Sequence, residues 1–335
     1  MKRLVQISLA LVIVVIVLGA YTRLTDAGLG CPDWPGCYGF ATVPTDEARM
    51  QAAEQAFPTA PLDHAKAWNE MIHRYAAGIL GLLIFAMAGF AIARKKQGLA
   101  HKPFKLPLFL SLLIIFQAAL GMWTVTMMLQ PAIVMGHLLG GFTTFSLLAL
   151  LYLQETDFNP PSADQHLVKL LPLVVMGMVV VIIQIALGGW VAANYAALAC
   201  TQLPICEGNW SERLEIVGAF TLEEASTYEF GIHSYAERMT MHVAHRIGAI
   251  VVLGVMLTLL GLLWRRAKSR WFKSLAAVIT FILVAQITLG ILNVMLSLPL
   301  FVAVAHNIVG AFLLVSLVVL TYALFKYTRK EVTHG

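Results

Sequence analysis

The sequence predicts an all-α membrane protein whose eight transmembrane helices form two similar four-helix bundles. Of its 335 residues, 59% are hydrophobic and 12% are charged, and the mean hydropathy is +0.79. This composition departs far from that of soluble globular proteins and excludes a water-soluble fold. Eight apolar runs are each long enough to cross a bilayer core about 30 Å thick as a helix. They cover residues 4–22, 69–93, 106–128, 132–153, 170–192, 238–264, 274–296 and 300–325.

The first run also has features of a secretory signal, because it follows Met1-Lys2-Arg3 and contains the small pair Gly19-Ala20. Leu18, however, is a poor residue for the position two before Ala20 at a cleavage site. The run also has a counterpart at 170–192, deep inside the chain, where no signal could be removed. We therefore expect the first helix to remain part of the protein.

The distribution of Lys and Arg predicts the orientation, because cytoplasmic loops retain positive charge. In an eight-span arrangement the basic segments share one side of the membrane: 2–3, 94–105, 265–273 and 326–330. Both termini are therefore expected in the cytoplasm, and the long loops 23–67 and 193–237 on the periplasmic side. The same bias explains the net charge of +5, so we expect no nucleic-acid partner. A start at Met1 without an Arg- and Ser-rich presequence favours the bacterial cytoplasmic (inner) membrane.

An internal repeat divides the chain into two halves. Sliding the sequence by 169 residues aligns Cys31 with Cys200, Cys37 with Cys206, Gln117 with Gln286, Gly121 with Gly290 and His137 with His306. The pattern Gln-x-x-Leu-Gly ends at Gly121 and Gly290, and again at Gly188. We predict an N-terminal half at 1–155, a cytoplasmic linker at 156–169 and a C-terminal half at 170–335. Because each half has an even number of spans, the repeat is parallel, with a pseudo-twofold axis along the membrane normal.

The register changes in the second and sixth helices. His73-Arg74 matches His245-Arg246 at an offset of 172, whereas the strict offset of 169 would pair His73 with His242. We prefer the first alignment because it keeps the His-Arg dipeptide and because loops tolerate the insertion that it needs.

Four histidines lie about one to two turns inside the even-numbered helices, near the outer side: His73, His137, His245 and His306. Each one alone is well explained as a packed, hydrogen-bonded histidine. Four at matched depth, two in each half, instead indicate ligands, because imidazoles inside a membrane span are costly and rare. A pair of neutral imidazoles on facing helices is a suitable axial set for haem iron, so we predict one haem in each half.

Zinc is the main rival ligand, since histidine also binds zinc, but it needs two further ligands at comparable depth. The first half offers only Glu70. The second half adds His242, three residues before His245 and on the same helical face, so zinc stays an alternative there.

Charged residues adjoin the histidines. Arg74 and Arg246 directly follow their histidines, where a guanidinium fork could pair with haem propionates or anchor the helix at the interface. Glu70 precedes His73 by three residues and projects on the same face. It is a candidate for proton handling in C–H oxidation, or else a solvated first-turn glutamate favoured by the helix dipole.

The four cysteines lie in the outer loops as two pairs, Cys31 with Cys37 and Cys200 with Cys206, in a compartment where disulfides persist. Local structural disulfides are one interpretation of these pairs. Haem delivery or a thiol relay is the other.

Taken in order, Glu70-x-x-His73-Arg74, His137-Leu-Leu-Gly-Gly, His245-Arg246 and His306-Asn-Ile-Val-Gly-Ala resemble the haem A synthase family of the bacterial, eight-helix type. The resemblance spans essentially the whole chain. It implies oxidation of the C8 methyl group of haem O by two successive hydroxylations, giving a geminal diol that loses water to leave the formyl group of haem A. This is the last step of haem A biosynthesis, which serves cytochrome oxidase assembly.

The resemblance also implies a role for each half. His73 and His137 would be axial ligands of the substrate haem O, with Glu70 as the catalytic residue. His245 and His306 would hold the iron of a permanent haem b, which supplies or relays electrons, with His242 beside that site. Haem O synthase would deliver the substrate, while the electron donor is unidentified.

Two other functions are consistent with a histidine-bearing helical membrane protein. A dihaem b-type electron carrier usually places haems on both sides of the membrane, whereas these four ligands share the outer side. A parallel-repeat transporter would need polar residues at the midplane and broken helices. Lipid surrounds the protein in each case, and Gly78, Gly81 and Gly89 permit close helix contacts, which leaves a homo-oligomer open.

Overall fold

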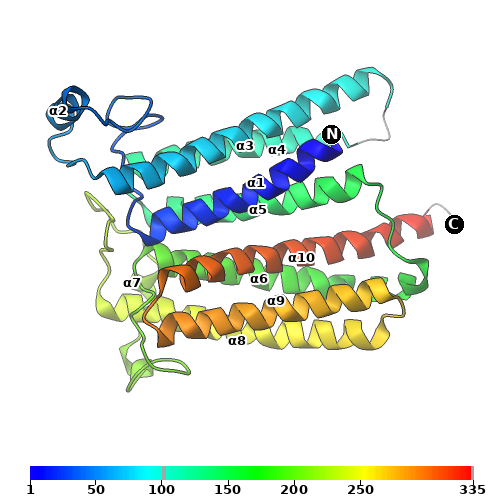
Figure 1. The fold of residues 1–335 in the computed structure, drawn as a ribbon. Coiled ribbons are helices and arrows are strands. Elements are labelled where there is room, and N and C mark those ends of the chain that lie inside the picture. The colour runs from blue at the N-terminus through cyan, green and yellow to red at the C-terminus, as the bar shows by residue number, and fades with distance from the viewer. Residues whose placement is uncertain (100–102, 333–335) are drawn as a thin grey trace.

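The computed structural model describes residues 1–99 and 103–332, and within these residues the regular structure is helical. Eight helices are long and apolar enough to cross a membrane (Figure 1). They are α1 (Lys2–Leu24), α3 (His64–Lys96), α4 (Lys105–Thr126), α5 (Pro131–Glu155), α6 (Leu171–Ala193), α8 (Tyr235–Arg266), α9 (Arg270–Met295) and α10 (Leu300–Val332). The predicted class, an all-α multi-pass membrane protein with eight spans, is confirmed.

The helices α3 and α8 begin several residues before their apolar runs. Asp63 caps α3, since its side chain accepts hydrogen bonds from the N–H groups of Ala65 and Lys66. Ser234 caps α8 and forms a capping box with Glu237. These polar caps extend both helices beyond the apolar core of the bundle. His73 and His245 therefore lie further from their helix starts than His137 and His306 do.

The long loops and the two chain ends lie at opposite ends of the bundle (Figure 1). We call the end that carries loops 25–63 and 194–234 the loop end. The first loop contains the short helix α2 (Glu47–Ala56), and the second contains a 3₁₀ turn (Trp210–Arg213) and α7 (Ile216–Ala219). These elements were not predicted, because segments this short carry no clear hydrophobic period.

The two halves use the same helix packing. In the first half α1 packs against α3 and α5, and α4 packs against the same two helices. In the second half α6 packs against α8 and α10, and α9 packs against the same two. The halves meet through α1, α5, α6 and α10, with Phe145 and Phe312 in edge-to-face contact at a centroid distance of 5.4 Å. This recurrence agrees with a parallel repeat, although the duplication itself stays a prediction.

The predicted linker 156–169 is tied to the second half. Most of it forms a 3₁₀ segment, η1 (Ser162–Leu170), which packs against α6, α8 and α10. The carboxylate of Asp164 is fully buried and accepts hydrogen bonds from the N–H groups of Lys268, at 2.6 Å, and Ser269, at 2.9 Å. The Tyr327 hydroxyl donates to the Pro161 carbonyl at 2.6 Å. The segment is therefore a docked element.

Replacing Asp164 with alanine should lower the thermal stability of the protein. Each backbone N–H left buried without a partner costs about 1–3 kcal/mol. The midpoint of thermal unfolding in detergent should fall clearly for Asp164→Ala. Asp46→Ala, which removes an exposed cap of α2, is the control and should change it less. Equal midpoints for the two variants would contradict the docking role of Asp164.

Candidate functional site

The four predicted histidines form two pairs near the loop end, one in each half. In the first half the ring centroids of His73 on α3 and His137 on α5 lie 6.4 Å apart, with 84° between the ring planes. In the second half His306 on α10 lies within electrostatic range of His245 on α8. All four rings are half-buried. The structure thus brings together the residues that the sequence analysis paired.

The spacing of the first pair suits axial ligation of one metal ion. A bond from a metal ion to an imidazole nitrogen is about 2 Å long, so two rings on opposite sides of one ion have centroids roughly 6 Å apart. The observed 6.4 Å between His73 and His137 agrees with this value. The nearly perpendicular ring planes leave each ring free to face a porphyrin edge-on. The donor set therefore fits haem iron.

Each histidine ring lies against a glycine of a neighbouring helix. A Cβ atom added to that glycine would meet Cε1 of the ring closely: Gly19 with His73 (2.9 Å), Gly121 with His137 (3.4 Å), Gly188 with His245 (2.9 Å) and Gly290 with His306 (3.1 Å). Distances near 3 Å are shorter than a carbon–carbon contact of 3.5–4.0 Å, so a larger side chain would push the ring aside. The glycines of α1, α4, α6 and α9 therefore make room for the histidine rings.

These glycines explain the repeated pattern in the odd-numbered spans. Gln-x-x-Leu-Gly ends at the glycine that contacts a histidine in α4, α6 and α9. In α1 the corresponding stretch runs from Val15 to Gly19. The sequence analysis considered Gly19 only as part of a cleavage site and missed its contact with His73. The shared Leu-Gly ending was the signal that could have revealed it.

Each ring also has a backbone partner in the residue four positions before the glycine that it contacts. Nδ1 of His306 lies 3.2 Å from the backbone oxygen of Gln286, and Nδ1 of His245 lies 3.0 Å from the side-chain nitrogen of Gln184. The backbone of Val15 is a hydrogen-bond partner of the His73 ring, and that of Gln117 is a partner of the His137 ring. The same backbone position therefore faces the ring in both halves.

Glu70 is a buried carboxylate with two partners. It is 4% exposed, and its Oε2 accepts a hydrogen bond from the Cys31 N–H at 2.9 Å. Its Oε1 accepts from the guanidinium of Arg74 in a buried ion pair. Glu70 lies one turn before His73, on the same face of α3. It is not the solvated first-turn glutamate that the sequence left as an alternative.

His242 occupies the place in the second half that Glu70 has in the first. The Cys200 N–H donates to Nδ1 of His242 at 3.4 Å. In the same way the Cys31 N–H donates to Oε2 of Glu70 at 2.9 Å. This correspondence favours the alignment of His73 with His245 at an offset of 172. One half therefore carries a carboxylate beside its ligand, and the other carries an imidazole.

Both arginines clasp the loops that the disulfides close. The structure joins Cys31 to Cys37 and Cys200 to Cys206. Arg74 donates to the carbonyls of Asp33 (2.9 Å) and Gly36 (2.5 Å); Arg246 donates to those of Cys200 (2.7 Å), Gln202 (2.5 Å) and Ile205 (2.5 Å). The sequence analysis missed this role. A contact of either arginine with a propionate stays a prediction.

Other clusters and cavities lie apart from the histidine pairs. Among the described residues, the groups with metal-ligand spacing are Cys200, Cys206 and Glu207, and Glu223, His233 and Glu237. Neither includes His242 or His245, so no zinc set supports that alternative. The cysteines of the first group are disulfide-bonded, and His233 already lies 3.5 Å from Glu237.

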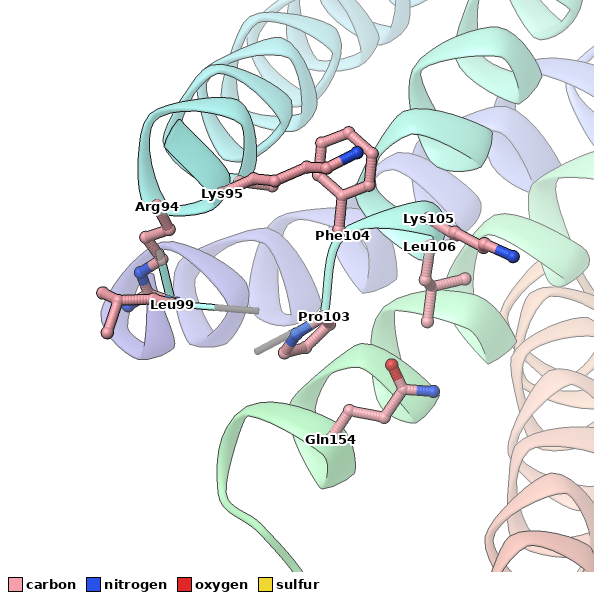
Figure 2. A pocket seen from close by; sticks show the side chains of 9 residues that line it. Arg94, Lys95, Leu99, Pro103, Phe104, Lys105, Leu106 and Gln154 are labelled. Carbon is pink, nitrogen blue, oxygen red and sulfur yellow. The ribbon is translucent and has the colours of Figure 1, made fainter. Parts of the chain in front are cut away.

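A cavity of about 410 Å³ lies at the other end of the bundle, where α3, α4 and α5 end or begin. Figure 2 shows that its lining includes Arg94, Lys95, Phe104 and Gln154, with the Lys95 ammonium 4.1 Å from the centre of the Phe104 ring. A larger hollow of about 620 Å³ lies between the ends of α8 and α9 on the same side. Neither hollow is lined by a histidine, so both lie apart from the histidine pairs.

Several known proteins are similar to the chain over most of its length. Residues 2–318 match the family of cytochrome oxidase assembly proteins. A heme A synthase of Shewanella oneidensis is 48% identical over 324 residues, which cover 96% of this chain and 96% of that protein. The heme A synthase of Azorhizobium caulinodans is 28% identical, covering 92% of this chain and 89% of that protein. That of Shouchella clausii is 25% identical, with 92% and 96% covered.

Replacing Arg246 with lysine should loosen the loop between Cys200 and Cys206. An ammonium cannot span three carbonyls as a guanidinium fork does, and each hydrogen bond to a charged group contributes about 1.5–3 kcal/mol. We expect backbone amides of residues 200–206 to exchange with deuterium roughly tenfold faster, measured by mass spectrometry. Arg265→Lys, at an exposed site on the same helix, is the control. Unchanged exchange in the loop would show that Arg246 does not hold it.

Proposed function

The chain belongs to the family of cytochrome oxidase assembly proteins, and from this membership we propose that it is a haem A synthase, which oxidises a methyl group of haem O to the formyl group of haem A. One observation supports placing the reaction in the first half. There an imidazole pair spaced for axial ligation lies beside a buried carboxylate, Glu70, which the second half lacks at the matching place. Haem O is the substrate that this activity requires.

We assign the substrate to the first half. His73 and His137 would bind haem O from its two faces. The residue one turn before the ligand is a carboxylate here and a histidine, His242, in the other half. Because oxidation of a C–H bond to an alcohol is coupled to proton transfer, the half with the carboxylate is the one equipped for the reaction.

We assign a permanent haem b to the second half. His245 and His306 would hold it, and Gly188 and Gly290 leave the room that their rings need. When bound, haem b would supply or relay the electrons that the oxidation exchanges. His242 would lie beside this haem and outside the ligand pair, since it points at the loop.

Glu70 is the proposed proton-handling group. The Cys31 N–H and the Arg74 guanidinium hold its two oxygens, which fixes the carboxylate in one orientation. Three residues along a helix correspond to about 4.5 Å, so Glu70 overhangs the substrate bound at His73. It would exchange a proton with the reacting centre in each hydroxylation. Arg74 balances its charge in the apolar surroundings and also holds the loop that the Cys31–Cys37 disulfide closes.

The protein would lie in the bacterial inner membrane with both termini in the cytoplasm and the cysteine loops in the periplasm. Basic residues support this orientation, since Arg94, Lys95, Arg265 and Arg266 end their helices opposite the loop end. Haem O synthase is the proposed donor of the substrate.

The alternative of a dihaem electron carrier fits the arrangement poorly. Such a carrier needs haems near both membrane faces, whereas both histidine pairs lie near the loop end against glycines in the last turns of their helices. Two haem sites at the same depth leave no haem near the other membrane face to pass electrons across the bilayer. This leaves the enzyme as the function that the geometry supports best.

Glu70→Gln should abolish most of the conversion while leaving haem b in place. The amide keeps the shape of the side chain and an oxygen for the Cys31 N–H, but it cannot take up a proton. General acid–base groups contribute about 10²–10⁴-fold to rate, so haem A formation should fall by about a hundredfold or more. Chromatography of extracted haems measures haem O and haem A, and the visible spectrum of the purified protein measures haem b. Normal haem A production would disprove the role of Glu70, with exposed Glu223→Gln as the unaffected control.

Gly188→Ala should release haem b although alanine is the better helix former. Its Cβ would lie 2.9 Å from the His245 ring, and overpacking costs about 1–3 kcal/mol, so haem retention should fall by roughly tenfold. In the control, Gly254→Ala on α8, the new Cβ meets nothing within 4 Å, so haem retention should be unchanged. Haem content per protein after purification is the measurement. The same loss in both variants would mean that helix stability, and not room for His245, governs haem binding.

A further inference from the structure

Three side chains that can bind a metal ion meet at the loop end of the second half. Glu223 and His233 belong to the loop 194–234, and Glu237 lies in the first turn of α8. A ligand atom of each lies within 4.8 Å of those of the other two. His245 follows Glu237 by eight residues, which is about 12 Å along the helix, so this group is separate from the haem ligands.

His233 is buried, and its ring points into the group. The residue is 6% exposed, and its Nδ1 makes no hydrogen bond to the described residues. Oε2 of Glu237 lies 3.5 Å from Nδ1. An N–H···O hydrogen bond measures about 2.7–3.2 Å, so this separation is too long for one. A buried ring nitrogen without a partner is costly, and a metal ion between the ring and the carboxylate would remove that cost.

The separation of 3.5 Å is the one expected between two ligands of a single ion. Bonds from zinc to nitrogen or oxygen are about 2.0–2.2 Å long, so at the tetrahedral angle two ligand atoms lie roughly 3.4 Å apart. Glu223 is exposed, which gives its carboxylate room to approach as the third ligand. One imidazole with two carboxylates suits zinc better than calcium or magnesium, which prefer oxygen ligands alone.

The carboxylate of Glu237 is held in place by its neighbours. The Ser234 N–H donates to its Oε2 at 2.7 Å as part of the capping box of α8. Gly218 of α7 leaves room for its Oε1, since a Cβ atom added there would collide with this oxygen. Carboxylates that bind metal ions are usually hydrogen-bonded in this way by surrounding groups. Glu237 is therefore oriented before an ion arrives.

An ion at this place would hold a loop segment that reaches the other half. The Tyr228 hydroxyl donates to the Glu223 carbonyl at 2.8 Å. The Tyr228 N–H donates to the Met128 carbonyl at 3.0 Å, in the turn between α4 and α5 of the first half. The segment 223–233 thus touches the first half at Tyr228, and its two ends lie at the metal-ligand group.

We propose that Glu223, His233 and Glu237 bind one Zn²⁺ ion, which fastens the segment 223–233 to the start of α8. The proposal does not rest on which haem each half binds. Its competitor is an ion pair between a protonated His233 and Glu237. That ion pair does not involve Glu223, so replacing Glu223 distinguishes the two explanations.

The first arm of the test titrates purified full-length protein with zinc chloride, after chelator treatment and dialysis, and measures heat. The wild type should bind one zinc ion that Glu223→Gln binds about 10–100-fold more weakly or worse, because loss of a ligand costs at least as much as loss of an outer contact. Glu224→Gln, at the exposed neighbouring position, is the control and should bind zinc as the wild type does. Equal zinc affinity in Glu223→Gln and Glu224→Gln would overturn the proposal.

The second arm follows hydrogen–deuterium exchange of the backbone amides by mass spectrometry. Zinc should slow the exchange of residues 223–233 about tenfold in the wild type, and much less in His233→Gln. Calcium at the same concentration should leave the exchange unchanged, because an imidazole is a poor calcium ligand. Exchange in the wild type that does not respond to zinc would show that His233 and Glu237 form an ion pair alone.

Discussion

The rest of the structure depends on one packing constraint: four imidazole rings lie inside an apolar bundle, and each needs a neighbouring helix without a side chain at the point of contact. Gly19, Gly121, Gly188 and Gly290 meet this requirement. Because a larger side chain at any of these positions would push the ring aside, each glycine permits the direction that the imidazole faces. The placement of the rings therefore depends on the odd-numbered spans as well as on the helices that carry the histidines.

The sequence predicted the parts of this arrangement that have a strong local signal. Apolar runs of about 20 residues define the eight helices, and the depth of His137 and His306 follows from where those runs begin. The contacts of Arg74 and Arg246 were not predicted, because a guanidinium that meets loop carbonyls some 40 residues away leaves no periodic pattern. Neither was the docking of Asp164, whose partners lie about 100 residues further on.

The site itself was predicted as a set of residues but not as a set of contacts. Glu70 and His73 were paired because they share a helical face, which is a local property. That Glu70 is buried depends on the Cys31 loop folding over it, which is a tertiary property. The register of α3 against α8 was ambiguous in the sequence. The contacts of Cys31 with Glu70 and of Cys200 with His242 now favour one alignment.

Comparison of the two halves shows which contacts both halves share and which occur in one half only. Arg74 and Arg246 both bind the carbonyls of a disulfide loop, yet only Arg74 also pairs with a carboxylate. The contact between arginine and loop therefore does not depend on Glu70. A buried carboxylate is costly without a counter-charge, and placing it beside an arginine that the loop already needs offsets that cost. The exchange of a carboxylate for an imidazole at this one place thus distinguishes two halves that share the same helix packing.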